Sequence, residues 1–161
     1  FGLKLPTGET DVRNANGDLA ERSLQPGSGT TDILLGAYFS RQLGSGSSWF
    51  SDLQVQQPLN SHENFKPGMR VGFDVGYRYS AGDKLTLMVQ LNVLYKDRDQ
   101  GTEAEPEDSG GKFLFMSPGL SYMIAKKVQL YSFVQLPLYQ YLNGVQLTAD
   151  WSVVAGISTR F

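Results

Sequence analysis

Apolar and polar side chains alternate along most of the chain. In the clearest segment, Met69 to Tyr79, every second residue is apolar or aromatic, and the residues between are Arg, Asp or Gly. The segments Leu85 to Tyr95 and Asp150 to Phe161 repeat this pattern. Alternation with a period of two over about ten residues predicts a β-strand with one apolar and one polar face.

Five weaker segments bring the predicted strands to eight, and we find no convincing helix. The weaker segments are Phe1–Thr7, Asp32–Leu43, Trp49–Asn60, Lys112–Ile124 and Val128–Leu142. Proline cannot donate to a strand ladder, so we expect bulges or locally broken pairing at Pro58 and Pro137. Pro118 falls in the middle of its segment and predicts a bulge or kink near Ser117–Gly119.

The connections between the segments alternate between long and short. The polar stretches Gly8–Thr31, Ser61–Gly68 and Arg98–Gly111 are long, and the connections between them are tight turns. Asn143-Gly144 predicts a hairpin turn and is the one exception. Short turns on one side and longer loops on the other are typical of outer-membrane barrels. We therefore predict an all-β, antiparallel up-and-down transmembrane β-barrel with about eight strands, forming a single domain over residues 1–161.

A soluble barrel of the lipocalin type would show the same alternation with its faces reversed. The membrane alternative is favoured because mid-strand Lys is absent and the polar faces consist of Gly, Ser, Gln and Asn with a few Arg and Asp. The outward, apolar faces also carry aromatic residues near strand ends, where membrane girdles form: Trp49, Tyr79, Tyr95, Phe113, Tyr122, Trp151 and Phe161. The longest uncharged run, Val128 to Ala149, contains glutamines and a proline, which excludes a membrane-spanning helix.

Composition narrows the function classes. The formal net charge is −2, so the chain lacks the basic character of a nucleic-acid-binding protein. There are no cysteines, which excludes disulfides, zinc ribbons and thiol catalysis. His62 is the sole histidine, and no Gly-x-Ser-x-Gly motif is present, so we predict no catalytic residues and no enzyme activity.

Two stretches resemble a known family. They are Gly2-Leu3-Lys4-Leu5-Pro6-Thr7-Gly8 and Leu24-Gln25-Pro26-Gly27-Ser28-Gly29-Thr30-Thr31-Asp32 with the following Leu34-Leu35-Gly36, and the ending from Val134 to Phe161 is similar as well. The family is that of the bacterial outer-membrane transporters named for the meta-pathway of phenol degradation. The resemblance implies a passive channel or uptake porin for small molecules, hydrophobic or aromatic compounds among them. Family members are usually longer at the N-terminus, which implies that early strands are lacking here.

The polar faces supply the candidate functional residues. Arg70, Asp74 and Arg78 recur every four residues, on one side of a strand. We expect a selectivity lining of the lumen formed by Arg70, Asp74, Arg78, Gln90, Asn92, Gln135, Asp150 and Arg160. The alternative is that these charges pair across strands and plug a narrow barrel, leaving a closed structural or adhesive protein whose outer loops bind a partner.

Two loops have compositions that occur in ligand-binding sites. The carboxylates of Asp97 to Asp108 could hold calcium, but their order does not match the calcium-binding loop, so a solvated outer loop is favoured and no metal site is predicted. The glycine-rich Leu24–Thr30 lacks the lysine of a phosphate-binding loop. Its backbone freedom suits a loop folded over the mouth or into the lumen, but a plain extracellular loop is favoured. No cofactor is predicted.

The predicted partners are outer-membrane lipid and lipopolysaccharide, a small-molecule solute, and the barrel-assembly machinery, which would recognise the C-terminal Phe161. The predicted location is the bacterial outer membrane.

Overall fold

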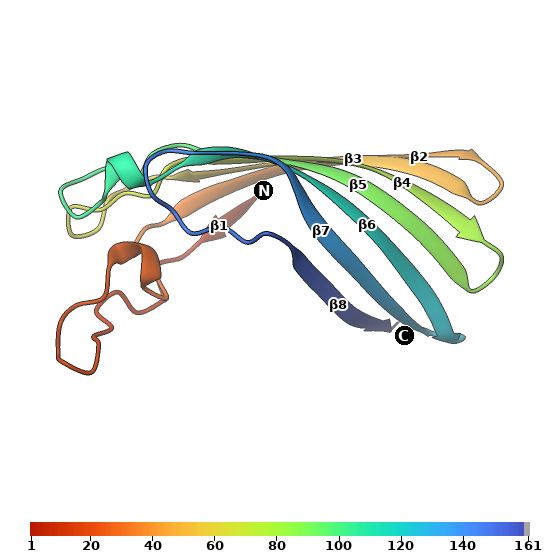
Figure 1. Cartoon of the computed structure of the whole chain (residues 1–161), viewed down its shortest axis with the longest axis horizontal. Helices are drawn as coiled ribbons and strands as arrows, with labels where there is room; N and C mark the ends of the chain where they lie inside the picture. Colours follow the sequence, from red (N-terminus) through yellow and green to blue (C-terminus); the bar gives the residue numbers. More distant parts are fainter. Residues whose placement is uncertain (160–161) are drawn as a thin grey trace.

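Eight strands form one antiparallel sheet in which each strand pairs with its neighbours in the sequence (Figure 1). The structure is a computed structural model and describes residues 1–159, apart from the side chain of Ser23. The strands are β1 (Gly2–Lys4), β2 (Asp32–Gly44), β3 (Ser47–Pro58), β4 (Arg70–Ala81), β5 (Leu85–Lys96), β6 (Gly111–Ala125), β7 (Val128–Leu142) and β8 (Ser152–Thr159). Two single turns of 3-10 helix, η1 (Arg22–Leu24) and η2 (Pro106–Asp108), lie in the loops.

The predicted all-β antiparallel class and the eight strands are confirmed. β7 has the predicted bounds, and β4 and β5 differ from their predictions by a residue or two. β1 is shorter than expected because the chain turns just after it, where the Thr7 amide donates to the Leu5 carbonyl at 2.9 Å. Within residues 1–159, no helix has the length and apolar character needed to cross a membrane.

The sheet is open in the part of the chain that the structure describes. Its strand order begins at β1 and ends at β8, and no ladder joins these two strands. β1 pairs with β2 only from Gly2↔Leu34 to Lys4↔Asp32, which leaves residues 35–44 of β2 without a partner on that side. β8 pairs with β7 alone. The described sheet therefore has two free edges.

The sheet curves, so that one face is concave and the other convex. β8 and the loop 5–31 lie on the concave side of the longer strands (Figure 1). Ser117 and Ser121, each 3% exposed, occupy concave positions. Phe73 and Leu91, on the convex face, are 43% and 42% exposed. The apolar face of this sheet is thus its exposed face.

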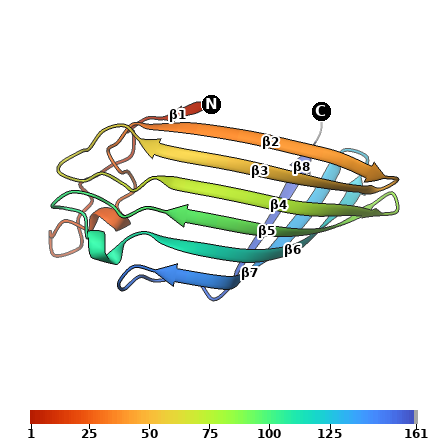
Figure 2. The same cartoon turned by 90° about the horizontal axis from the view of Figure 1, so that it is seen from above.

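Long and short connections segregate to opposite ends of the strands (Figure 2). Loops 5–31, 59–69, 97–110 and 143–151 lie at one end, which we call the loop end, and the turns 45–46, 82–84 and 126–127 lie at the other, the turn end. The hairpin predicted at Asn143-Gly144 is wrong, because the connection runs from 143 to 151. Asn143 donates to the Ser109 carbonyl at 2.9 Å, and the Val145 amide donates to Asp108 Oδ1 at 2.8 Å, so this loop packs on loop 97–110 instead of turning back at once.

The three prolines have different effects on the ladders. At Pro137 the predicted irregularity is confirmed: the β6–β7 register shifts between Leu114 and Phe115, opposite Pro137. The irregularity predicted at Pro58 is wrong: Pro58 ends β3 and pairs with Asp32 without a break, and the amide of the next residue, Leu59, donates to the Thr31 carbonyl at 2.9 Å. The bulge predicted near Ser117–Gly119 is wrong. Pairing with β7 lapses at Ser117 and Pro118 but resumes in the same register at Gly119, so the ladder is interrupted without an added residue.

Candidate functional site

The concave face carries most of the residues expected to line a lumen. Arg70, Asp74 and Arg78 occupy alternate concave positions of β4, and the ladder to β5 sets Asp74 opposite Asn92 and Gly76 opposite Gln90. Gln135 of β7 lies opposite Ser152 of β8, whose hydroxyl donates to Gln135 Oε1 at 3.4 Å. The expected residues of β4 and β5 thus form one group, and Gln135 lies on a more distant strand.

The two remaining candidates lie elsewhere. Asp150 is exposed in loop 143–151, just before β8 begins, so it is not on the strand where the sequence pattern predicted it. Arg160 lies outside the described residues, as does Phe161.

Two aspartates lie at the middle of the concave face. Asp52 of β3 is the direct partner of Asp74 in the β3–β4 ladder. Gln54 donates to Asp52 at 2.9 Å, Asn92 donates to Asp74 at 2.8 Å, and the Ser117 hydroxyl donates to Asn92 Oδ1 at 2.6 Å. No basic group among the described residues lies within ion-pair distance of either aspartate. Sequence reasoning missed Asp52; the signal available was its spacing of two and four residues from Gln54 and Gln56, which lie on the same face of β3.

Toward the turn end of the concave face, two aromatic rings and an arginine pack together. The guanidinium carbon of Arg78 lies 4.2 Å from the ring centroid of Phe50, which is 6% exposed. The ring of Tyr38 stacks beyond Phe50 at a centroid distance of 6.2 Å. A cation over an aromatic face is attracted by the negative charge of the ring face, so Phe50 fixes the position of Arg78.

At the loop end, Asp32 is fully buried within a polar cluster. Its carboxylate accepts hydrogen bonds from Thr30 at 2.7 Å, from Gln56 at 2.5 Å and from Lys4 at 3.0 Å. The same Lys4 ammonium also donates to Ser28 at 2.5 Å. These bonds hold the end of loop 5–31 and the short strand β1 against the first residues of β2.

Loop 5–31 is ordered by polar contacts and close backbone approaches. Gln25, 9% exposed, accepts a hydrogen bond from the Val12 amide at 3.0 Å and donates to the carbonyls of Val12 and Ala20. Gly29 has a φ of +67°, and a side chain there would overlap the ring of His62. The glycine-rich stretch, interpreted from sequence as a plain extracellular loop, therefore packs tightly against loop 59–69.

An ion pair also joins these two loops. The Arg22 guanidinium donates to Glu63 and, through Nη1, to the Thr10 carbonyl at 3.0 Å. The hydrogen bond and positive charge of Arg22 hold the pKa of Glu63 below its ordinary value. His62 Nε2 lies 3.4 Å from the Thr10 hydroxyl and 3.7 Å from Glu63. The sole histidine therefore lies within a contact between two loops.

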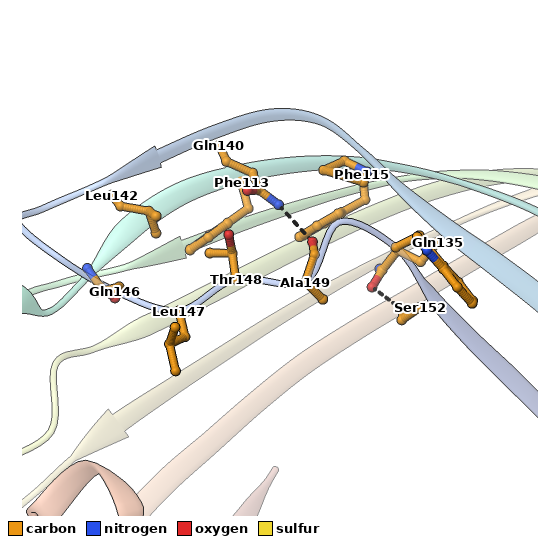
Figure 3. A pocket seen from close by; sticks show the side chains of 12 residues that line it. Phe113, Phe115, Gln135, Gln140, Leu142, Gln146, Leu147, Thr148, Ala149 and Ser152 are labelled. Carbon is orange, nitrogen blue, oxygen red and sulfur yellow. Dashed lines mark hydrogen bonds between the residues drawn. The ribbon is translucent and has the colours of Figure 1, made fainter.

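An aromatic pocket opens on the concave side between β6, β7 and loop 143–151. Phe113 and Phe115 project from β6 toward Thr148 and Ala149 (Figure 3). Their rings stack with centroids 6.0 Å apart and planes at 5°. Gln135, Gln140 and Ser152 add polar groups to a cavity of about 230 Å³. Phe113 was expected on the outer apolar face; this is wrong, because it shares the concave face with Phe115 and Ser117.

One carboxylate of the acidic loop 97–110, that of Asp99, is buried. Asp99, 6% exposed, accepts hydrogen bonds from the Gly68 amide at 2.7 Å and from the Lys96 ammonium at 2.9 Å. Over residues 1–159, no three His, Cys, Asp or Glu side chains gather as metal ligands would. Asp99 thus ties loop 97–110 to loop 59–69, just before β4, and to the end of β5.

Comparison of the chain with family models, with curated proteins and with solved structures gave no match.

Proposed function

We propose that the sheet is part of the wall of an outer-membrane β-barrel that acts as a passive channel for small molecules. The observation that carries the proposal is the exposure of the apolar face. Leu87, Val89, Leu91 and Val93 of β5 are each 42–46% exposed, whereas Ser117 and Ser121 on the polar face are buried. A soluble barrel would place these apolar side chains inside, while a lipid-facing wall exposes them.

The distribution of charge fits a lipid-facing band. At the convex positions of β2–β8 within residues 1–159, the charged side chains are Arg41, close to the turn end, and Lys112, at the loop end. Between them the convex face consists of apolar, aromatic and small polar residues. Strands β4 and β5 each have 12 residues, and a transmembrane strand needs about 9–11 when tilted.

If the sheet spans a membrane, its two free edges must be paired. In lipid, each unpaired backbone N–H or C=O group costs several kcal/mol, so open sheet edges do not occur there. We therefore propose that in the membrane the outer edges of β2 and β8 are paired and the barrel is closed. The concave face then becomes the lumen wall, with Arg70, Asp74, Arg78, Gln90, Asn92 and Gln135 on it, and Asp52 joins them.

The solute class follows from the lining. A lumen with separate charged groups and an aromatic pocket suits small organic molecules that carry an apolar ring or chain. The stacked Phe113 and Phe115, with Gln135 and Gln140 beside them, support the aromatic or hydrophobic solutes that the family resemblance implies. The membrane of a Gram-negative bacterium, with its lipid and lipopolysaccharide, would surround the wall. Recognition of Phe161 by the assembly machinery stays a prediction.

A second candidate is a closed structural or adhesive barrel whose loops bind a partner. It is favoured by the packing of the long loops on one another, because loop 5–31 is tied to loop 59–69 through Arg22 and Glu63, and loop 143–151 to loop 97–110 through Val145 and Asp108. Ordered loops at one end of a barrel offer a defined surface for recognition.

Conductance in a planar lipid bilayer distinguishes the two. The purified protein, with folding shown by heat-sensitive migration in a gel and insertion shown by co-flotation with vesicles, is added at high salt. Stable ohmic current steps support the channel. Folded and inserted protein that gives no current contradicts the channel and favours the closed barrel.

A further inference from the structure

A cavity of about 360 Å³ lies at the loop end, between loop 5–31 and the sheet. Residues 25–28 and Arg22 line it from the loop, and Gln56, Arg70 and Lys96 line it from the ends of β3, β4 and β5. These three strand residues are direct partners in the ladders, Gln56↔Arg70 and Arg70↔Lys96. The cavity is thus built by residues distant in the sequence and is distinct from the aromatic pocket.

Cations outnumber carboxylates in this lining. Lys4, Arg22, Arg70 and Lys96 contribute positive charge, and Asp32 and Asp99 contribute negative charge. Both carboxylates are already paired, because Asp32 binds Lys4 and Asp99 binds Lys96 at 3.0 Å and 2.9 Å. The Arg22–Glu63 pair accounts for one further cation. Arg70 is the cation of this lining that has no ion-pair partner among the described residues.

Two further features favour the binding of an anion in this cavity. Arg70 lies directly opposite Lys96, and like charges facing each other across a strand pair are destabilising. The side chain of Arg22 is only 9% exposed, yet its Nε has no hydrogen-bond acceptor in the described structure. A buried donor without an acceptor costs free energy that a bound anion would recover.

We propose that this cavity binds a small organic carboxylate, with Arg70 as its main ionic partner. The proposal rests on the proposed channel function and names a solute class for it. Arginine suits the role because its planar donors match the two oxygens of a carboxylate. The ammonium of Lys96, opposite Arg70, is paired with Asp99, and the free Nε of Arg22 is a candidate second donor.

The cavity also contains apolar residues that can contact the apolar part of the ligand. Phe65, 5% exposed, lines the cavity with Pro26 and Pro67. A volume of about 360 Å³ falls at the lower end of the range for ligand pockets, which suits a molecule the size of one ring with a carboxylate. Benzoate has this size and charge and serves as the probe, and benzamide is its uncharged counterpart.

Equilibrium binding to the folded protein in detergent tests the proposal without requiring conductance. Isothermal titration with benzoate is compared for the wild type, Arg70→Gln and the matched control Arg13→Gln. Arg13 belongs to the same loop region but is exposed and outside the cavity, where it donates to the Gly17 carbonyl at 2.8 Å. We expect the wild type and Arg13→Gln to bind alike and Arg70→Gln to bind at least about tenfold more weakly, the effect of losing one charged hydrogen bond.

Three outcomes would overturn the proposal: no binding of benzoate by folded wild type, binding of benzamide as tight as that of benzoate, or unchanged binding by Arg70→Gln. Far-ultraviolet circular dichroism of each variant shows that the sheet is intact. Conductance is scored separately in the bilayer. A protein that conducts but does not bind benzoate refutes the anion site alone, and one that binds benzoate but does not conduct refutes the channel alone.

Discussion

The ring of Phe50 occupies the space that a side chain on Gly76 would need. The two residues are direct partners in the β3–β4 ladder, and a Cβ placed on Gly76 would collide with the end of the Phe50 ring. The end of the Phe50 ring therefore lies over Gly76 of β4, Arg78 of β4 lies over the ring face, and Tyr38 of β2 stacks with the ring. Because Gly76 has no side chain, the Phe50 ring has room to lie there and to contact Arg78 and Tyr38 on the concave face.

Replacement of Gly76 by Ala is expected to destabilise the protein by about 1–3 kcal/mol, the usual cost of overpacking a filled site. The measurement is urea unfolding in detergent, followed by tryptophan fluorescence. Gly72 supplies the matched control, because it lies on the same face of β4 and nothing is within 4 Å of its Cβ position. Gly72→Ala should leave stability unchanged or raise it slightly. Equal effects at both positions would show that Phe50 does not need the space over Gly76.

Replacement of Leu91 by Lys tests which face meets lipid. Leu91 lies on the convex face between Val75 and Met116, and a lysine at mid-membrane on a barrel exterior costs about 2–4 kcal/mol. Gln90→Lys places the same charge on the concave face and should cost much less. The free energy of folding into phosphatidylcholine vesicles, from urea titration, gives both values. A tolerated Leu91→Lys together with a damaging Gln90→Lys would reverse the faces and contradict the membrane proposal.

Strands could be predicted where apolar and polar residues alternate without a break. Where the alternation is broken, the prediction of which side chains lie on the concave face failed. In Met69 to Tyr79, apolar and polar residues alternate strictly, so both the strand and its concave Arg70, Asp74 and Arg78 were accessible from sequence. The run Phe113-Leu114-Phe115-Met116 is apolar on both faces. The pattern of apolar and polar residues therefore does not indicate which of these side chains lie on the concave face and which on the convex face. The wrong face assigned to Phe113, and with it the missed aromatic pocket, has this cause.

Contacts between loops had no signal in the sequence. Arg22 and Glu63 are 41 positions apart, in segments without regular structure, and no periodicity relates them. The cavity at the loop end depends on this packing, since Arg22 lines it from a loop and Arg70 from a strand. Asp52 was missed for a different reason: Ser51 and Gln57 make the other face of its strand partly polar, which weakens the alternation that marked Asp74.

Neutralising the facing aspartates is expected to shift the ion selectivity of the proposed channel toward anions. Asp52 and Asp74 are opposite one another and have no basic partner among the described residues, so both would act on a passing ion. A unit charge about 4 Å from an ion in water contributes about 1 kcal/mol, roughly a fivefold effect on permeability ratio. Reversal potentials in a salt gradient should therefore shift toward anions in Asp52→Asn and Asp74→Asn. Asp83→Asn, in the turn 82–84, is the control, and an equal shift there would mean that the aspartates act only through net charge.

The contact between loops 5–31 and 59–69 is expected to weaken in acid. Because Arg22 lowers the pKa of Glu63 from 4.5, the ionised carboxylate stabilises the folded loops at pH values above the unfolded pKa, and this stabilisation is lost as pH falls through the lower, folded pKa. Glu63→Gln should therefore be less stable than the wild type at pH 7, and the difference should vanish well below pH 4.5. Urea unfolding across this range measures it, with Glu107→Gln as control because Glu107 forms no ion pair in the described structure. A difference between wild type and Glu63→Gln that persists unchanged at low pH would show that the charge of Glu63 does not hold the two loops together.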